Sequence, residues 1–324
     1  MSVPTGDFEV EVISVQAVAD GVVAVELAAR GGASLPAWTP GAHIDLVLPS
    51  GLVRQYSLSG SPSAPTWRIG VLREDAGRGG SRWIADRLKP GVVLGAVGPR
   101  NHFAGERGEA GDAASTAPLV FVAGGIGVTP ILPMAAAAAV AGRDYRVHYS
   151  GHEGRMGFVD ELAAVHGDRL DVHVSEAGAR LDVSALAAEA AASGAEVVCC
   201  GPARLIDAVV AAGVAAGVPV TVERFESGLL SAPLWEGPFE VELTLTGVTV
   251  EVPADRSILD VAEEAGALVL SSCHEGTCGT CETPVLEGEV DHRDSILSPS
   301  QRARNDTMFV CVSRAACARL VLEL

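Results

Sequence analysis

Apolar and polar positions follow two different patterns along the first two thirds of the chain. From Phe8 to about Phe103, short runs such as FEVEVISVQAV and WRIGVLRE alternate apolar and polar residues, and Gly and Pro clusters separate them. This alternation is typical of strands with one buried face, so we expect a small antiparallel β-barrel. From Pro118 to Phe225, continuous apolar strands alternate with alanine-rich helical segments. That pattern predicts an α/β domain with a doubly wound parallel sheet.

A third pattern follows a segment rich in Gly, Pro and Ser between residues 226 and 238. It indicates a β-hairpin with Thr246 and Gly247 at its turn, a helix over Ile258 to Ala265, a cysteine loop and a last strand. This predicts an α+β domain. A chain of 324 residues exceeds the usual size of one core, so several domains are expected. The predicted bounds are 1–108 for the barrel, 109–227 for the α/β domain, 228–238 for a linker and 239–324 for the last domain.

The charge of the chain limits its partners. The formal net charge is −18, so nucleic acid and anionic membranes are not expected to bind. After Trp235 there are 16 acidic residues against 6 basic ones, and we expect this end to meet a basic surface of another protein. The chain begins without a basic segment followed by an apolar run, and no window approaches the roughly 20 apolar residues of a membrane span. We therefore expect a cytoplasmic protein.

Four of the seven cysteines have a spacing that predicts chemistry. Cys273, Cys278 and Cys281 form C-x4-C-x2-C, and Cys311 follows at a distance. This is the spacing of plant-type [2Fe-2S] sites, in which thiolates hold soft iron and backbone N–H groups stabilise the sulfurs. Zinc usually takes two C-x2-C pairs, and only one such pair is present here. A structural zinc site and unliganded thiols are the alternatives.

Two glycine-rich turns are candidates for phosphate binding. Gly124 to Pro130 (GGIGVTP) stands between an apolar strand and a helix expected from Pro130 to about Ala141. Its glycines permit close approach, Thr129 can cap the helix, and Pro130 fits the first helical position, so a pyrophosphate can rest there. Gly77 to Ser81 precedes a second helix, expected to begin near Arg82. Plain structural turns are the alternative in both places.

The order of three motifs resembles a known family. Arg54-Gln-Tyr56-Ser57-Leu58 lies in the barrel, the glycine turn follows a strand, and Cys200-Gly201-Pro202 follows a later strand. This order resembles the ferredoxin-NADP reductase superfamily. With the cysteine loop in a C-terminal domain, the chain is similar to the phthalate dioxygenase reductase family, which includes the vanillate O-demethylase reductases. The resemblance covers essentially the whole chain, and it implies a β-grasp fold for the ferredoxin domain.

The resemblance implies a role for individual residues. Arg54 would pair with the flavin phosphate, Tyr56 would pack on the flavin ring, and the Ser57 hydroxyl would reach the edge that receives hydride. Cys200 would lie beside the nicotinamide and Phe225 would cover the flavin, so Ser57, Cys200 and Phe225 are the predicted catalytic residues. The predicted cofactor-binding residues are Arg54, Gln55, Tyr56, Ser57, Val71, Leu72, Arg73, Gly79, Gly80, Ser81, Gly124, Gly125, Gly127, Thr129, Pro130, Cys200, Gly201, Pro202 and Phe225.

The resemblance also predicts which cofactors bind. Gly98-Pro99-Arg100-Asn101-His102-Phe103 looks like the P-R-N-x-F ending of FMN-dependent barrels, so FMN is predicted, with FAD as the alternative. A 2′-phosphate needs a basic pocket, and Glu153 opposes Arg155 at the relevant strand end, which favours NADH over NADPH.

The three cofactors predict one function. NADH gives electrons in pairs and a [2Fe-2S] centre accepts one, and a flavin between them can release the pair singly. The resemblance implies that Cys273 and Cys278 hold the iron nearer the surface, and Cys281 and Cys311 the other. It also implies a Rieske non-haem iron oxygenase as the transient, electrostatically bound acceptor. The alternatives are a cytochrome P450 as acceptor, or a redox-sensing role.

Overall fold

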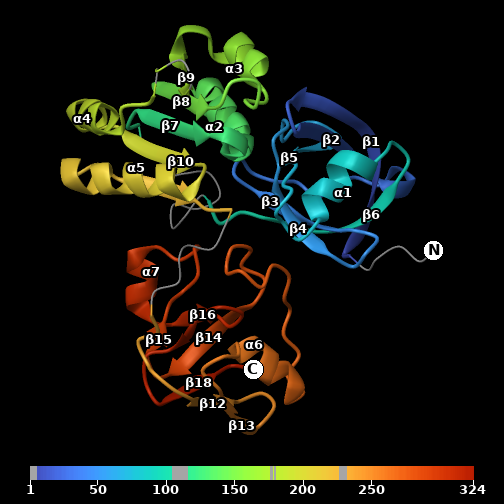
Figure 1. Cartoon of the computed structure of the whole chain (residues 1–324), viewed down its shortest axis with the longest axis vertical. Helices are drawn as coiled ribbons and strands as arrows, with labels where there is room; N and C mark the ends of the chain where they lie inside the picture. The colour runs from blue at the N-terminus through green and yellow to red at the C-terminus, as the bar shows by residue number, and fades with distance from the viewer. Residues whose placement is uncertain (1–5, 104–115, 176–177, 179, 226–231) are drawn as a thin grey trace. The chain divides into compact units, whose positions relative to one another are not determined.

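The chain divides into two units, Met1–Glu223 and Arg224–Leu324. The computed structural model describes residues 6–103, 116–175, 178, 180–225 and 232–324 (Figure 1). The predicted boundaries at 108/109 and 227/228 lie outside the described residues, so the domain bounds stay predictions. Within the described residues, no helix is long and apolar enough to cross a membrane.

The barrel is the first part of unit 1. Its six strands are antiparallel, in the order β4-β3-β6-β1-β2-β5, and a bridge between Leu58 and Ile69 joins the two edge strands, which closes the barrel. Apolar side chains at alternating positions fill it, as the alternation predicts. The elements are β1 (Phe8–Ala19), β2 (Val22–Ala29), a 3-10 turn (Arg30–Gly32), β3 (His43–Val47), β4 (Val53–Ser57), β5 (Trp67–Leu72), α1 (Gly80–Arg87) and β6 (Val93–Arg100).

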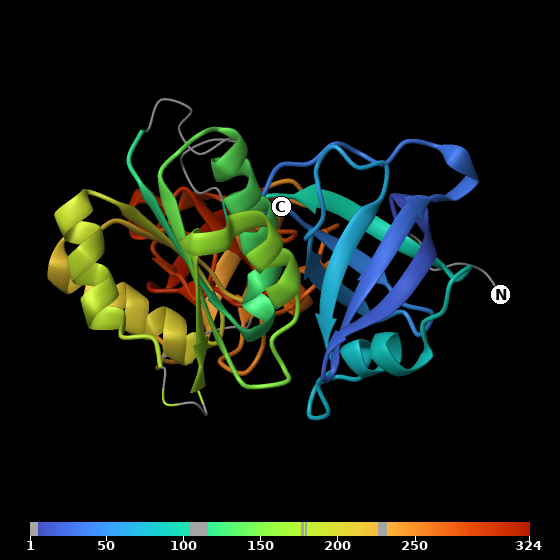
Figure 2. The same ribbon diagram turned by 90° about the horizontal axis from the view of Figure 1, so that it is seen from above.

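The α/β part of unit 1 is a parallel five-stranded sheet in the order β11-β10-β7-β8-β9. Figure 2 shows the yellow helices α4 and α5 on the opposite face of this sheet from the green helices α2 and α3, and a separate apolar core fills each face. The doubly wound prediction is confirmed. The elements are β7 (Leu119–Gly124), a 3-10 turn (Gly125–Gly127), α2 (Val128–Val140), β8 (Tyr145–Gly151), α3 (Val159–His166), a 3-10 turn (Gly167–Arg169), β9 (Leu170–Val174), α4 (Val183–Ser193), β10 (Glu196–Cys200), α5 (Ala203–Ala216) and β11 (Val220–Glu223).

Unit 2 has a mixed sheet in the order β13-β12-β18-β14-β16, with β12 and β18 parallel and the other pairs antiparallel. Helix α6 packs its apolar face into the core of this sheet, and the cysteine loop connects α6 to β14. The predicted α+β domain is confirmed. The elements are β12 (Phe239–Leu243), β13 (Val248–Val252), α6 (Ile258–Glu264), β14 (Glu282–Glu287), β15 (Val290–Asp291), α7 (Pro299–Arg304), β16 (Thr307–Phe309), β17 (Arg314–Ala315) and β18 (Arg319–Leu322).

Candidate functional site

Arg54 on strand β4 lies against the first residue of helix α1. A Cβ atom placed on Gly80 would lie 2.8 Å from the Nε atom of Arg54, so glycine leaves the room that this side chain occupies. Gly79 precedes the helix with φ 89°, a left-handed conformation that glycine adopts without strain. A guanidinium and the N–H groups of a first helical turn both suit a phosphate. The two segments predicted to hold the flavin phosphate are therefore neighbours.

Ser81 and Arg73 already have partners within the protein. The Ser81 hydroxyl accepts a hydrogen bond from the Glu74 backbone N–H at 3.2 Å, which ties the loop to the start of helix α1. The Arg73 guanidinium donates to the Asp86 carboxylate at 3.0 Å and also pairs with Asp75. Both predicted flavin residues thus hold strand β5, the loop and helix α1 together.

The other predicted barrel residues lie on β4 and β5. Gln55 donates to the buried Asp45 carboxylate at 3.0 Å, so its side chain braces β4 against β3. Burial raises the pKa of Tyr56, so its hydroxyl is neutral. Val71 is buried in the barrel core and Leu72 is half-buried. Of these four, the neutral Tyr56 ring suits packing on a flavin.

Ser57, Cys200 and Glu223 come together where the barrel meets the parallel sheet. Cys200 and Glu223 are paired neighbours at the carboxyl ends of β10 and β11, and the Ser57 side chain lies close enough to Glu223 to influence its pKa. The Ser57 side chain and Cys200 are buried. Burial, with Glu223 and Cys199 adding to it, raises the pKa of the Cys200 thiol, so this cysteine is neutral. A neutral thiol shapes the site and does not serve as a nucleophile.

The Glu223 carboxyl is expected to stay protonated at neutral pH. Burial raises its pKa to about 8, the nearby Ser57 side chain opposes this rise, and its Oε2 atom is fully buried. Because the folded pKa is raised, the stability that this group contributes is present at acid pH and is lost as the pH rises through about 8. We expect infrared spectra of the holoprotein to show a protonated carboxyl band that disappears through that pH. Glu223→Gln should lack this band; a wild-type carboxyl that titrates near its usual range would contradict the assignment.

The glycine turn after β7 packs directly on the turn after β10. A Cβ atom on Gly127 would lie 2.4 Å from the Cys200 carbonyl oxygen, and one on Gly124 would lie 2.7 Å from the Pro202 ring. A Cβ atom on Gly201 would lie 2.9 Å from the Gly124 Cα. These glycines therefore let two strand ends meet backbone to backbone at the carboxyl edge of the sheet. That edge is where nucleotides bind in doubly wound folds.

Two predicted roles in this turn are wrong. Helix α2 begins at Val128, so Pro130 is its third residue and not its first. The Thr129 hydroxyl donates to the Ile126 carbonyl at 2.9 Å and does not cap the helix. The reason is that a 3-10 turn from Gly125 runs straight into the helix, so the helical geometry starts earlier than the proline suggests.

Tyr149 on β8 holds this turn in place. Its buried hydroxyl lies 3.1 Å from the Gly125 carbonyl and 3.1 Å from the Gly157 carbonyl, so one side chain joins the glycine turn to the loop after β8. Tyr149→Phe removes about 1 kcal/mol of hydrogen bonding. We expect the KM for NADH to rise about fivefold, with the rate of cluster-independent ferricyanide reduction at saturating NADH nearly unchanged. An unaltered KM would show that the turn does not need this contact.

The four predicted cluster ligands converge in unit 2. Cys273, Cys278, Cys281 and Cys311 are 1%, 1%, 3% and 8% exposed. Thiol contacts join Cys273 to Cys278 and Cys281 to Cys311, and Cys273 also contacts Cys311. No three His, Cys, Asp or Glu side chains in the described parts of the chain could hold a metal ion together. Four thiols in mutual contact fit a two-iron centre held by four cysteines, and the division of these cysteines between the two irons stays a prediction.

The loop directs N–H groups at these sulfurs. The Glu275 N–H lies 3.2 Å from the Cys273 sulfur, and the Thr277 N–H also bonds it. The Cys278 sulfur contacts the Thr280 hydroxyl at 3.2 Å and the Thr280 backbone. Such donors favour the thiolate that an iron–sulfur centre needs.

Gly276, which lies between the ligands Cys273 and Cys278, has no room for a side chain. Its φ is 66°, and a Cβ atom there would lie 2.5 Å from the Val312 side chain and 3.1 Å from the Asp294 Cα. His274 also has a left-handed φ, of 57°. These conformations curl the loop around the four sulfurs.

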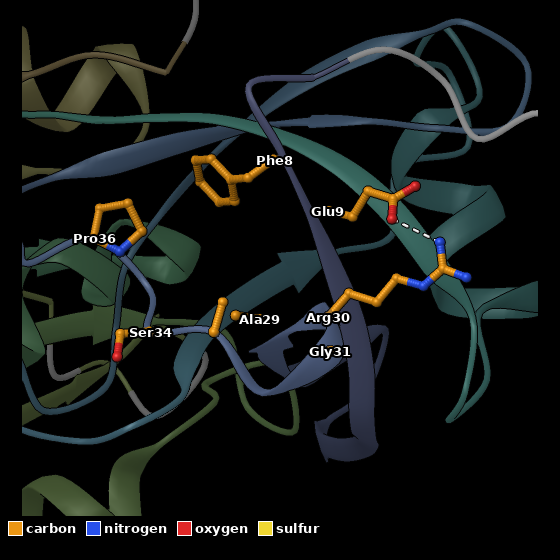
Figure 3. Close-up of a pocket in the computed structure, with 8 residues that line it drawn as sticks. Phe8, Glu9, Ala29, Arg30, Gly31, Ser34 and Pro36 are labelled. Carbon is orange, nitrogen blue, oxygen red and sulfur yellow. Dashed lines mark hydrogen bonds and ion pairs between the residues drawn. The ribbon is translucent and has the colours of Figure 1, made fainter.

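A hollow elsewhere on the barrel is not part of this site. Its volume is about 490 Å³, and Figure 3 shows Phe8 and Pro36 on its apolar lining and the Arg30–Glu9 ion pair, 2.6 Å long, at its side. None of its lining residues is a predicted site residue. Phe225 is 37% exposed at the start of unit 2, and its predicted place over the flavin stays a prediction.

Comparison with known proteins adds independent support. Residues 241–317 match the family model described as "2Fe-2S iron-sulfur cluster binding domain". The chain is 41% identical to a putative toluene-4-sulfonate monooxygenase system reductase subunit from Comamonas testosteroni, over 99% of this chain and 100% of that protein. The crystal structure of phthalate dioxygenase reductase is 33% identical, with TM-score 0.67, over 98% of both chains. The chain belongs to the phthalate dioxygenase reductase family.

Membership of the phthalate dioxygenase reductase family confirms several predictions. The protein is an oxidoreductase of the reductase class, with a C-terminal [2Fe-2S] domain. The predicted nicotinamide cofactor and [2Fe-2S] cluster agree with the phthalate dioxygenase reductase, whose structure is described as modular for electron transfer from pyridine nucleotides to [2Fe-2S]. A type IV self-sufficient cytochrome P450 monooxygenase is also similar, at 39% identity and TM-score 0.88, but this chain spans only 41% of its length.

The sequence does not single out Glu223 or Tyr149. Glu223 ends a strand in a stretch without a recognisable motif, and Tyr149 lies inside a strand that alternates apolar and polar residues. Their roles come from the neighbourhood of Ser57 and from contacts with Gly125 and Gly157, which belong to other segments of the fold.

Proposed function

We propose that this protein takes a hydride from NADH and passes two single electrons through its [2Fe-2S] domain to a separate oxygenase. One observation carries this proposal: a single chain holds both a glycine turn packed against Cys200, which neighbours Glu223, and a group of four buried thiols. When bound, FMN supplies the conversion between a hydride pair and single electrons.

The chain's own residues prepare this transfer. Arg54 and the N–H groups at the start of helix α1 hold the flavin phosphate, and Tyr56 with Phe225 packs on the ring. The glycine turns after β7 and β10 position the nicotinamide near Ser57. Glu223 stays protonated beside Ser57, so no carboxylate charge lies next to the proposed nicotinamide position. Cys273, Cys278, Cys281 and Cys311 hold the two irons.

The acceptor is proposed to be a Rieske non-haem iron oxygenase acting on an aromatic acid or ether. Relatives that match over their full length are named as reductase subunits of oxygenase systems, which means that the oxygenase is another protein there. The acidic residues after Trp235 suit a basic docking surface, and the contact is transient. The proposed use of NADH places the reaction in the cytoplasm.

A cytochrome P450 is the second candidate acceptor, because the self-sufficient P450 has the most similar fold among the structures named above. The experiment compares both acceptors. Holoprotein and NADH are mixed with the oxygenase component of toluene-4-sulfonate monooxygenase, with that of phthalate dioxygenase, or with the isolated haem domain of the self-sufficient P450. Product formation with a Rieske component, which weakens as salt rises, supports the proposal. Turnover with the haem domain alone would replace the Rieske acceptor by a P450.

A further inference from the structure

Two leucines beside the cluster loop are almost fully exposed. Leu268 is 99% exposed and Leu270 is 80% exposed, whereas Ala267 is buried and Val269 packs against the core of unit 2. The segment after helix α6 therefore alternates inward and outward, and its outward positions are leucines. We call Leu268 and Leu270 the leucine pair. Exposed apolar patches that are rimmed by polar residues mark interaction sites, so the surroundings of the pair decide its role.

The leucine pair is close to the buried thiols. Leu270 precedes Cys273 by three residues, and so few residues span at most about 11 Å even when fully extended. The ligand sulfurs are buried, so an electron acceptor has to approach the surface formed by the loop and the segment leading into it. Electron transfer slows steeply with distance, and a contact on the leucine pair brings an acceptor near the irons.

Acidic residues stand on either side of the leucine pair in the sequence. Glu263 and Glu264 on helix α6 are exposed, Glu264 in an ion pair with Arg256 at 2.7 Å, and Glu275 in the loop is half-exposed. An apolar centre with a charged rim is the usual organisation of a protein interface. Contacts between electron-transfer proteins are small, so two leucines are enough to form such a centre.

The charge of the chain decides between two occupants. Residues 1–223 hold 24 acidic and 16 basic residues, so the chain's own flavin-binding unit is acidic, like unit 2. Unit 1 is covalently linked to unit 2 and needs no charge attraction to deliver electrons, whereas a separate protein is drawn to an acidic rim by a basic surface. The occupant that the acidic rim fits is therefore a separate protein with a basic rim around an apolar spot.

We propose that the leucine pair is the apolar centre of the surface on which the oxygenase component docks to receive electrons. This inference rests on the proposed function. One electron passes from the reduced irons to the metal centre of the oxygenase in each encounter, and NADH supplies it through the flavin.

The test uses the holoprotein with Leu268→Ser and Leu270→Ser combined. The KM for an oxygenase component that accepts electrons from the wild type, either the toluene-4-sulfonate or the phthalate one, should rise about tenfold. The rate at which NADH reduces the cluster, followed anaerobically by EPR, should stay within about twofold of the wild type, because the pair is exposed and binds no cofactor. Iron content confirms that unit 2 has folded.

Leu286→Ser is the matched control. Leu286 is 53% exposed on β14, the strand that begins directly after Cys281, and five residues of strand place it about 17 Å from that ligand. This variant should leave the KM unchanged. An equal rise in both variants, or no rise in the double variant, would overturn the docking surface. Slow reduction of the cluster by NADH in the double variant would also overturn it, because the pair would then serve the chain's own flavin unit.

Failure of the proposed function gives a different result. If the wild type reduces its cluster with NADH but neither oxygenase component forms product, the oxygenase partner is wrong and the docking inference falls with it. If the wild type supports product formation and the double variant does so with the same KM, only the docking inference falls.

Discussion

Cys281→Ser is expected to abolish electron delivery to an oxygenase while leaving the chemistry of unit 1 intact. Cys281 is 3% exposed and contacts Cys311, so its loss removes one of two thiols from one iron. A serine hydroxyl is a harder and less acidic ligand that iron–sulfur centres accept poorly. We expect oxygenase-coupled turnover to fall by about 100-fold or more. Reduction of ferricyanide by NADH should stay within about twofold, because unit 1 supplies it.

Cys317→Ser is the control for this variant. Cys317 is half-buried in the same unit, and its thiol lies 3.2 Å from the Glu289 N–H, outside the group of four. This variant should keep its iron, its labile sulfide and its turnover. Retention of a full cluster in Cys281→Ser, or its loss in Cys317→Ser, would refute the ligand set.

Gly127→Ala is expected to lower the efficiency of NADH oxidation more than a glycine-to-alanine change at any other position of the two glycine turns. The new Cβ atom would lie 2.4 Å from the Cys200 carbonyl oxygen and 2.6 Å from the Gly201 nitrogen, and both are backbone atoms that cannot turn aside. Relief requires the two strand ends to separate, at a cost of about 3 kcal/mol. We expect kcat/KM for NADH to fall roughly 10- to 100-fold, because the nicotinamide is displaced from the reacting position. Steady-state ferricyanide reduction measures this loss.

Gly142→Ala separates a steric clash from backbone strain. Gly142 follows helix α2 with φ 66°, and no atom lies within 4 Å of the position that its Cβ would take. Alanine should therefore cost only roughly 1–2 kcal/mol of stability, with kcat/KM unchanged. A similar kcat/KM in Gly127→Ala and the wild type would mean that the two glycine turns do not form the nucleotide site.

The sequence predicts those parts of the molecule that depend on local pattern. Alternation predicts strands with one buried face, which specifies the barrel. Continuous apolar strands before alanine-rich helices predict strands that helices cover on both faces, which specifies the parallel sheet. The cysteine spacing likewise names four ligands that the fold brings together. Local chemistry also places Arg54 and Gly80 in phosphate-binding segments, and the fold makes them neighbours.

What the sequence leaves out depends on contacts between distant segments. Glu223 becomes a neutral acid because burial removes water from its carboxyl, and the nearby Ser57, from a strand of another sheet, only partly opposes this rise of its pKa. Tyr149 is an ordinary core residue until its hydroxyl is seen between two loops. Thr129 and Pro130 look like a helix start, but a preceding 3-10 turn sets the helix earlier. Exposure of the leucine pair is similarly invisible in a sequence of apolar residues.

In the proposed function, electrons from NADH reach thiol-bound irons in unit 2 by way of a flavin in unit 1. Anaerobic addition of NADH to purified holoprotein, followed by EPR and by chromatography of the released flavin, is the decisive experiment. We expect about two irons and two labile sulfides per chain, FMN as the released flavin, and a reduced-cluster signal that vanishes when the flavin is removed. Zinc in place of iron, or a cluster that NADH reduces equally well without flavin, would contradict the proposed function.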